Sequence, residues 1–463
     1  MKPFDREIVS GSIYKSVWKL AWPVTLLNLV NGAQGFVDHV LVGHFIPSAN
    51  NAANAAIGVA WQMFLVIVVF VASIFHGSNV LIARYAGRQD RENLSSVAYQ
   101  AFLSAVWFLA IVIAPLGYWA SPYLLRFVAA TEEVQRYSLP YLRIMFTCGT
   151  PLFLVFLFGG VFQASGEPKT ALKMGIFCTA LNITLSSLLI TGAGPFPQLG
   201  TSGAALGTVL ATTVTVFVVI GLIAGNKTIV QLPRRFTIFP DWKILKIIVR
   251  IGVPTGVQGV LLNLGGVFLL KFIDMLPHAA AAQAAYTICY AQLFSLVTWA
   301  AFGMRAAAST IMGQNIGAGN PQRGKRGVAV SAAYGLIWAI AWGIIFWTIP
   351  HKLLGLFNAT EEPTFSYGQS LLRYMSVSGL ALAAALALTG GLQGAGETRI
   401  PMYIAFISQI VVLLGVCGIF KFFDALTVER VWLAILISHV TRLFLTYAVF
   451  RTEKWAYTRL EID

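Results

Sequence analysis

Asp38 is a carboxylate inside an apolar stretch, Trp22 to Phe45, that is long enough to form a membrane-spanning helix. An ionised carboxylate in hydrocarbon costs roughly 2.5–3.5 kcal/mol on insertion scales, so such a group normally faces a cavity or a partner. Residues three, four and seven positions apart share a helix face, which puts Asn31, Gln34 and Gly35 beside this carboxylate. A carboxylate on a polar face can take up a proton or a cation, and Asp38 is therefore the first candidate for chemistry.

The composition predicts the kind of element that carries this carboxylate. Of 463 residues, 57% are hydrophobic and 11% are charged, and the mean hydropathy is +0.74. Apolar runs of about 20 residues recur along the chain, which is typical of a polytopic all-α membrane protein. No soluble stretch reaches the size of a domain, so a separate catalytic or nucleic-acid-binding domain is excluded.

Twelve membrane spans are predicted, at approximately 15–45, 52–84, 92–118, 134–163, 168–192, 203–225, 243–275, 279–313, 322–349, 364–392, 399–421 and 428–450. The net charge of +14 comes from Lys and Arg residues in alternate short loops, as the positive-inside rule explains, and does not indicate a nucleic-acid partner. This asymmetry predicts that both termini lie in the cytoplasm, and we expect a multi-pass protein of the plasma (inner) membrane. Nothing in the loops indicates an obligate partner, so we expect a monomer.

The two halves of the chain repeat each other at an offset of about 230 residues. The matching segments are Ala130-Thr131-Glu132-Glu133 with Ala359-Thr360-Glu361-Glu362, Leu142-Arg143-Ile144-Met145 with Leu372-Arg373-Tyr374-Met375, and Gln163-Ala164-Ser165-Gly166-Glu167 with Gln393-Gly394-Ala395-Gly396-Glu397. We predict two six-helix lobes, 1–225 and 243–463, which a cytoplasmic linker (226–242) joins and a pseudo-two-fold axis relates. Such paired lobes suit alternating access around a site between them.

The motifs together resemble the multidrug and toxic compound extrusion (MATE) family. They are the duplicated Gln-x-x-Gly-Glu element, the segment from Val37 to His44 in span one, and the segment from Gly313 to Asn320 after span eight. The resemblance covers essentially the whole chain. It implies a transporter and not an enzyme: a secondary antiporter with two six-helix lobes, which exports small organic compounds while H+ or Na+ moves inward.

The resemblance also implies a cation-coupling site in the first lobe. It combines Asp38 with Asn182 of span five and Thr208 of span six, and residue counting places all three in the outward half of their spans. Many relatives carry a second aspartate four residues after the asparagine, where this chain has Ser186. A single carboxylate of raised pKa suffices for a proton, which favours H+, whereas Na+ at Asp38 would rely on amide and hydroxyl oxygens. No cofactor and no other metal is expected.

A residue that is present in both halves is expected to serve the architecture that the halves share. A residue that is present in one half only is expected to serve a task performed once. Arg143 and Arg373 are duplicated, as are Glu167 and Glu397, and we interpret both pairs as structural. Asp38 has no acidic counterpart in the second half.

The second lobe lacks the carboxylates that some relatives place in spans seven and ten, because Leu262 and the apolar segment 380–385 stand there. It carries two unduplicated cations instead. Lys271 is expected to pair with Asp274 or to extend towards the membrane surface. Arg305 has two interpretations. If its side chain faces the cleft, it would favour anionic or zwitterionic substrates. If it faces Asp274 or helix-end carbonyls, its role would be structural.

Substrate contacts in a cavity are expected from polar side chains within the spans. These are Asn31, Gln34, Asn263, Gln283, Tyr290 and Gln292, together with Arg305.

Two alternatives stay open. A flippase for a polyisoprenoid-linked lipid precursor commonly has additional spans and several basic residues in its central cavity, and this sequence shows no evident basic group of that kind in its core. A membrane-embedded transferase would need a membrane-proximal histidine or carboxylate pair, and the six histidines show neither metal-ligand spacing nor a partnered acid.

Overall fold

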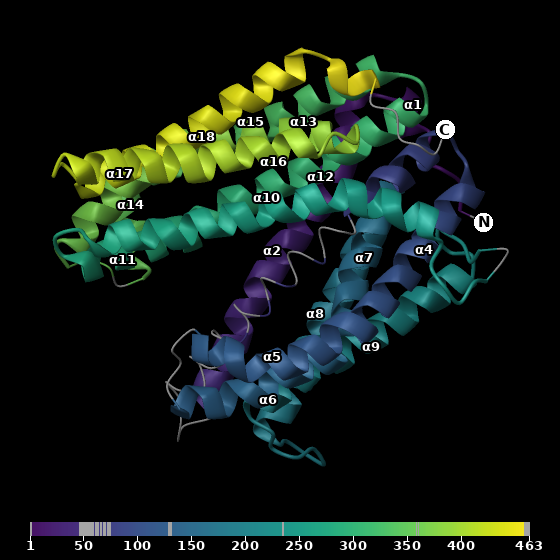
Figure 1. The fold of residues 1–463 in the computed structure, drawn as a ribbon, viewed down its shortest axis with the longest axis horizontal. Helices are drawn as coiled ribbons and strands as arrows, with labels where there is room; N and C mark the ends of the chain where they lie inside the picture. Colours follow the sequence, from purple (N-terminus) through teal and green to yellow (C-terminus); the bar gives the residue numbers. More distant parts are fainter. Residues whose placement is uncertain are drawn as a thin grey trace. The chain divides into compact units, whose positions relative to one another are not determined.

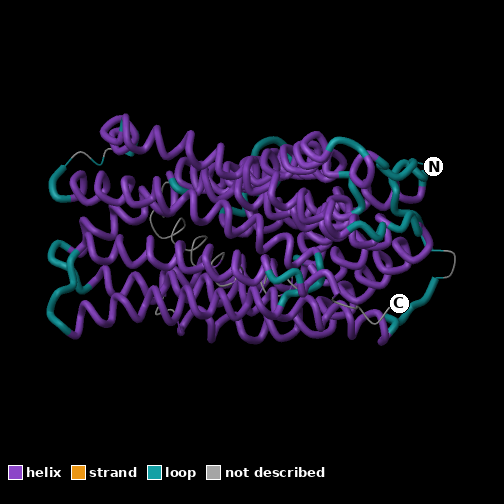
Figure 2. Tube along the Cα trace, turned by 90° about the horizontal axis from the view of Figure 1, so that it is seen from above, coloured by secondary structure: helices purple, strands orange, loops and turns teal. Residues whose placement is uncertain are grey.

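The computed structural model describes residues 2–457 except 46–59, 61–63, 65–66, 68–70, 72–75, 128–131, 234–235, 358 and 360; at 33–45, 127, 133 and 457 it describes the backbone alone. All regular structure in this part of the chain is helical (Figures 1 and 2). Backbone N–H and C=O groups have no water to bond in hydrocarbon, and helices satisfy them internally.

The helices of the first half are α1 (Glu7–Ser10), α2 (Ile13–Phe45), α4 (Arg91–Phe108) continued by η2 (Leu109–Ile113) and α5 (Ala114–Phe127), α6 (Glu132–Cys148), α7 (Thr150–Ala164), α8 (Pro168–Thr191) and α9 (Thr201–Ala224). Those of the second half are α10 (Trp242–Asp274), α11 (Ala279–Tyr286), η3 (Thr287–Leu293), α12 (Ser295–Gly317), α13 (Pro321–Thr348), α14 (Pro350–Gly355), α15 (Thr364–Gly394), α16 (Arg399–Phe406), η4 (Ile407–Leu414), α17 (Gly415–Phe422), α18 (Val428–Arg451) and η5 (Lys454–Tyr457).

The described residues contain nine helices that are long and apolar enough to cross a membrane, and α6 with α7 form a further pair bent by 55°. The predicted span 52–84 lies largely outside the described residues.

By internal contacts the chain forms two compact units. Unit 1 comprises Met1–Phe4 and Leu26–Gly252, and unit 2 comprises Asp5–Thr25 and Val253–Asp463. The chain therefore changes unit within α2 and again within α10. In unit 1, α8 packs on α9, and α7 contacts both. In unit 2, α15 is the central helix and contacts α12, α13 and α18.

Small residues let α15 occupy this central position. A Cβ atom at Gly390 would lie 2.1 Å from the carbonyl oxygen of Arg305, and one at Gly394 would lie 2.2 Å from that of Ser309. Because the two glycines are one turn apart, the backbones of α12 and α15 touch along one face, which is how small residues bring membrane helices together.

The repeated Gln-x-x-Gly-Glu elements form the same turn. Gly166 has φ +92° and Gly396 has φ +90°, a left-handed conformation that glycine adopts without steric cost. The next amide in each case donates back into the helix, from Glu167 to Phe162 at 2.7 Å and from Glu397 to Leu392 at 2.9 Å. The sequence repeat is thus also a structural repeat.

The duplicated charged residues make structural contacts, as predicted. Arg143 lies 4.4 Å over the ring of Tyr118, and Arg373 lies 5.6 Å over that of Trp347. Glu167 is buried, pairs with Lys2 and accepts the amide of Ile229 at 2.7 Å. Glu397 accepts two amides at the start of α16, those of Arg399 and Ile400, each at 3.2 Å.

This difference in environment predicts unequal effects of one substitution at the two repeat positions. Glu167→Gln removes the charge from a buried carboxylate that holds two separate segments, so we expect a loss of roughly 1.5–3 kcal/mol of stability. Glu397→Gln weakens only a helix cap, for which about 0.5–1 kcal/mol is expected. Thermal unfolding of the two purified variants compares them directly, and equal melting temperatures would contradict this reading of Glu167.

Candidate functional site

Three of the four predicted cation-coupling residues lie in contact in unit 1. The amide nitrogen of Asn182 donates to Thr208 Oγ1 at 2.9 Å and to Ser186 Oγ at 3.4 Å. Asn182 is 1% exposed and Ser186 is fully buried, at 0%. The cluster thus gathers one amide and two hydroxyl groups inside two apolar helices, α8 and α9.

Close packing of α8 on α9 brings these groups together. Gly207 precedes Thr208, and a Cβ atom at Gly207 would lie 2.4 Å from Ser186 Oγ. The Thr208 hydroxyl donates to the Ala204 carbonyl at 3.0 Å, so its oxygen is the atom that accepts from Asn182. Because Asn182 donates through its nitrogen, its amide oxygen is the atom of the right type to accept from a protonated carboxyl or to coordinate a cation.

Asp38 and Gln34 lie on α2, where the structure describes the backbone but not the side chains, so their predicted contacts fall outside the described residues. Asp38 belongs to unit 1, as do Asn182, Ser186 and Thr208. Asn31, also on α2, has an exposed side chain.

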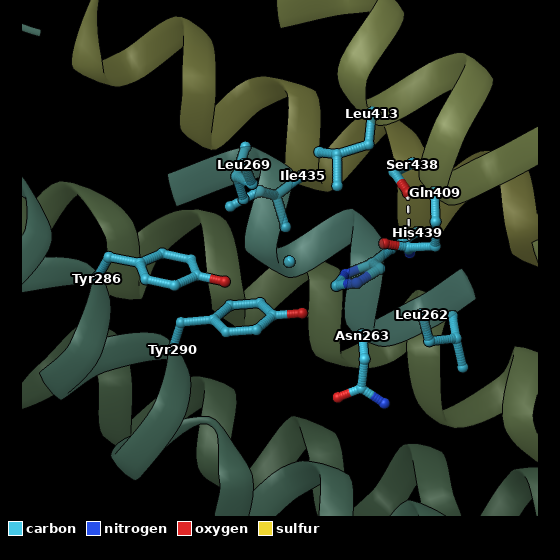
Figure 3. A pocket seen from close by; sticks show the side chains of 11 residues that line it. Leu262, Asn263, Leu269, Tyr286, Tyr290, Gln409, Leu413, Ile435, Ser438 and His439 are labelled. Carbon is cyan, nitrogen blue, oxygen red and sulfur yellow. Dashed lines mark hydrogen bonds between the residues drawn. The ribbon is translucent and has the colours of Figure 1, made fainter. Parts of the chain in front are cut away.

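Unit 2 contains a cavity of about 180 Å³ (Figure 3). Its walls come from α10, α11, η3, η4 and α18. The lining residues are Leu262, Asn263, Gly266, Leu269, Tyr286, Tyr290, Gln409, Leu413, Ile435, Ser438 and His439.

Two of the predicted substrate contacts, Asn263 and Tyr290, line this cavity. Two others lie elsewhere in unit 2. Gln283 donates to the carboxylate of Asp274 at 3.2 Å, and Gln292 is exposed on η3.

Aromatic rings form one wall of the cavity. Tyr286 and Tyr290 stack with their centroids 4.9 Å apart, Phe294 follows 5.6 Å from Tyr290, and His439 stacks on Phe294 at 6.2 Å. Figure 3 shows the two tyrosine hydroxyls pointing to the same side as the His439 ring. Two polar lining residues also bond to each other, since Gln409 donates to Ser438 at 3.2 Å. The cavity thus combines flat apolar surface with several polar groups.

Arg305 is anchored by amides. Its Nε donates to Gln393 Oε1 at 3.1 Å, and Gln393 donates to Gln258 at 2.9 Å. The guanidinium also lies 5.9 Å from the ring of Phe302. The structural interpretation that paired Arg305 with Asp274 is therefore wrong, since Asp274 accepts from Gln283 instead.

Lys271 does not pair with Asp274 among the described contacts. Its side chain is exposed and lies 5.7 Å over the ring of Phe268, which agrees with the alternative that it extends outward.

Arg442 and His439 of α18 are functional candidates that the sequence analysis missed. Both are 3% exposed, and Arg442 lies near enough to Arg305 for their charges to repel. The expectation that the core contains no basic group is therefore wrong for unit 2. An ionisable residue within the apolar stretch Val428–Arg451 was the signal that would have found Arg442, the same signal that identified Asp38.

Metal-binding clusters are absent from the part of the chain that the structure describes: it holds no group of three histidine, cysteine or acidic side chains placed to bind a metal.

Comparisons with known proteins cover most of the chain. The MatE family model matches residues 23–188 and 254–417, one match in each half. The chain is 26% identical over 442 residues to the probable multidrug resistance protein YoeA of Bacillus subtilis, covering 95% of this chain and 94% of that protein. It is 25% identical over 444 residues to the probable multidrug resistance protein NorM of Thermotoga maritima, covering 96% and 93%.

The fold matches equally well. A multidrug resistance MATE family transporter of the MOP superfamily, solved in an outward-facing conformation, superposes with a TM-score of 0.87 at 20% identity over 98% of both chains. This confirms the predicted all-α fold of twelve transmembrane helices in two lobes. The duplicated family match, which covers most of the sequence, shows that this chain belongs to the MATE family of membrane transporters.

Proposed function

We propose that the protein is a secondary active antiporter that exports organic compounds of the multidrug type in exchange for H+ or Na+, with coupling through Asp38. It works as a monomer in the plasma (inner) membrane, with both termini in the cytoplasm, and alternates access between its two six-helix lobes. The observation that carries the proposal is the cluster of buried Asn182 and Ser186 with half-buried Thr208, because amide and hydroxyl groups of this kind would complete a proton or cation site around one carboxylate.

Packing between α2 and α8 supports placing Asp38 beside this cluster. A Cβ atom at Gly175 would lie 2.1 Å from Leu27 Cδ1, so the two helices touch at that level. Spans one and five run in the same direction in the predicted topology. Asp38 lies eleven residues after Leu27, and Ser186 lies eleven residues after Gly175. At 1.5 Å per residue both are about 16 Å further along, which puts them at one level.

The coupling then follows from the charge of a single group. Ionised Asp38 favours the substrate-binding state, and its protonation removes the charge, lets α2 bend and repack, and releases the substrate. Ser186 stands where many relatives carry a second acid, so one carboxylate carries the change in charge. A single carboxylate favours H+ as the coupling ion, because a dehydrated Na+ would have one negatively charged ligand where two carboxylates would supply two.

Removing one hydroxyl group of the cluster tests its part in ion binding. We expect Thr208→Val, which keeps the side-chain shape, to raise the coupling-ion concentration for half-maximal export about fivefold, equivalent to ~1 kcal/mol for one lost hydrogen bond. If the ion is H+, the pH midpoint falls accordingly.

Thr213→Val is the matched control, because the Thr213 hydroxyl donates only to the Val209 carbonyl, at 2.6 Å, among the described contacts. Ion titrations of export in proteoliposomes compare the two variants. If both titrate alike, the cluster takes no part in coupling.

A further inference from the structure

Unit 2 keeps two guanidinium groups among helices that contain almost no acid. Arg305 is the eleventh residue of α12 and Arg442 the fifteenth of α18, so both lie well inside their helices. From Val253 to Arg451 the acidic residues of the long helices are Asp274 and Glu429, which lie at helix ends. Neither arginine forms a salt bridge among the described residues. Arg442 is buried and Arg305 is half-buried, and a charge held inside a group of apolar helices calls for an opposite charge from a ligand.

The two residues of α18 also have unused hydrogen-bonding atoms. Nη2 of Arg442 and Nδ1 of His439 are buried and have no hydrogen-bond partner in the described part of the chain. Both side chains are 97% buried, since each is 3% exposed. Buried polar atoms without a partner are uncommon in folded proteins, and a ligand that accepts hydrogen bonds would satisfy them.

Both residues lie on the face of α18 that borders the cavity. His439 and Ser438 line it, and Arg442 follows three and four residues later, on the same helix face. The charge of Arg442 also acts on Tyr290, another lining residue, as well as on Arg305. Arg442 is therefore close enough to both a cavity-lining residue and Arg305 for its charge to act on them.

The cavity limits the size and shape of the ligand. Its volume of about 180 Å³ is below the ~300–1,000 Å³ that is usual for drug-sized sites. The stacked rings of Tyr286 and Tyr290 line the cavity and offer apolar surface next to the basic groups. A small anionic group joined to a planar or apolar body fits both features.

We propose that unit 2 contains an anion-binding site, formed by Arg305 and Arg442 beside the cavity lined by Tyr290 and His439, that takes the carboxylate or phosphate group of an organic anion. The guanidinium groups bind the charged oxygens, and the aromatic wall holds the apolar body. That this anion is exported cargo rests on the proposed function, whereas the binding site itself does not.

A pair of probes with the same ring and opposite charge tests the site. Full-length protein in phosphatidylcholine nanodiscs is titrated calorimetrically with 1-naphthoate and with 1-naphthylmethylammonium, with no ion gradient present. We expect naphthoate to bind at least tenfold more tightly. Equal binding of the two probes, or tighter binding of the ammonium compound, overturns the proposal. This test uses the wild-type protein alone, so it does not depend on whether a variant folds.

Variants then locate the site. Arg442→Gln and Arg305→Gln should each weaken naphthoate binding roughly tenfold to a hundredfold, as expected for a lost charged hydrogen bond. Arg442→Lys keeps the charge and should retain more affinity than Arg442→Gln. Arg373→Gln is the matched control, because that guanidinium is exposed and lies over Trp347. Unchanged affinity in both Arg442→Gln and Arg305→Gln would overturn the assignment.

A second set of nanodiscs that contain phosphatidic acid identifies the source of the anion. If a lipid headgroup occupies the site, naphthoate binding weakens in these discs for the wild type but not for Arg442→Gln. If the ligand is soluble, binding is the same in both discs, and either result supports the shared anion chemistry.

Since no transport is measured, loss of the anion preference would leave the proposed antiport standing, and a failure of antiport would leave the binding result intact.

Discussion

Replacing Asp38 by asparagine should abolish export against a concentration gradient. The amide resembles the protonated carboxyl in shape but cannot lose a proton, so Asp38→Asn holds the transporter in the state that releases substrate. Gradient-driven export should fall to the rate of protein-free liposomes, because Ser186 offers no second carboxylate to take over.

Asp274→Asn is the control for this variant, since Asp274 lies at the end of α10 with an exposed side chain and accepts only from Gln283 among the described contacts. It should export at nearly the wild-type rate. Wild-type export by Asp38→Asn would show that coupling does not pass through this residue.

Gly390→Val should cause the largest loss of stability among the variants considered. The first added carbon would stand 2.1 Å from the Arg305 carbonyl oxygen, a backbone atom that cannot rotate away. α12 and α15 must then separate, and overpacking of this kind costs roughly 1–3 kcal/mol or more. The shift would also displace Arg305 from Gln393, so naphthoate binding should weaken as well.

Gly418→Val in α17 is the matched control, because nothing lies within 4 Å of a Cβ atom at Gly418. Thermal unfolding of the two purified variants, followed by tryptophan fluorescence, measures the difference. Equal melting temperatures would mean that α12 and α15 do not pack through Gly390.

The fold could be predicted because the bilayer restricts it so strongly. The length of each apolar stretch shows where the chain can cross the membrane. The repeated turns at Gly166 and Gly396 require glycine, which the sequence has at both places. The cluster of Asn182 and Thr208 was also predictable, since both stand at motif positions within adjacent spans. The residue types were enough, because regular helices preserve their spacing.

Side-chain directions in unit 2 could not be predicted by α-helical counting. Between Gln283 and Gln292 the helix changes to the wider π form of η3, Thr287–Leu293, which shifts the face that each later residue presents. Tyr286 stacks on Tyr290 and Tyr290 packs against Phe294, whereas Gln292 is exposed. A local change in helical period has no clear mark in the sequence.

Gln393 shows a second limit. It belongs to the duplicated Gln-x-x-Gly-Glu element, and duplication indicates shared architecture, yet its side chain holds the unduplicated Arg305. Only the close contact of α12 with α15 reveals this role. A residue can therefore serve the repeat through its backbone and a local task through its side chain.

The coupling claim is tested most directly in inside-out proteoliposomes that hold wild-type protein. An imposed H+ gradient, acid inside, and an imposed Na+ gradient, high inside, are applied separately while accumulation of ethidium and of 1-naphthoate is followed. We predict that one of the two ion gradients, with H+ favoured, drives at least one probe above its equilibrium level, and that Asp38→Asn removes this accumulation. Accumulation that neither gradient drives, or that persists unchanged in Asp38→Asn, would contradict antiport through a single carboxylate.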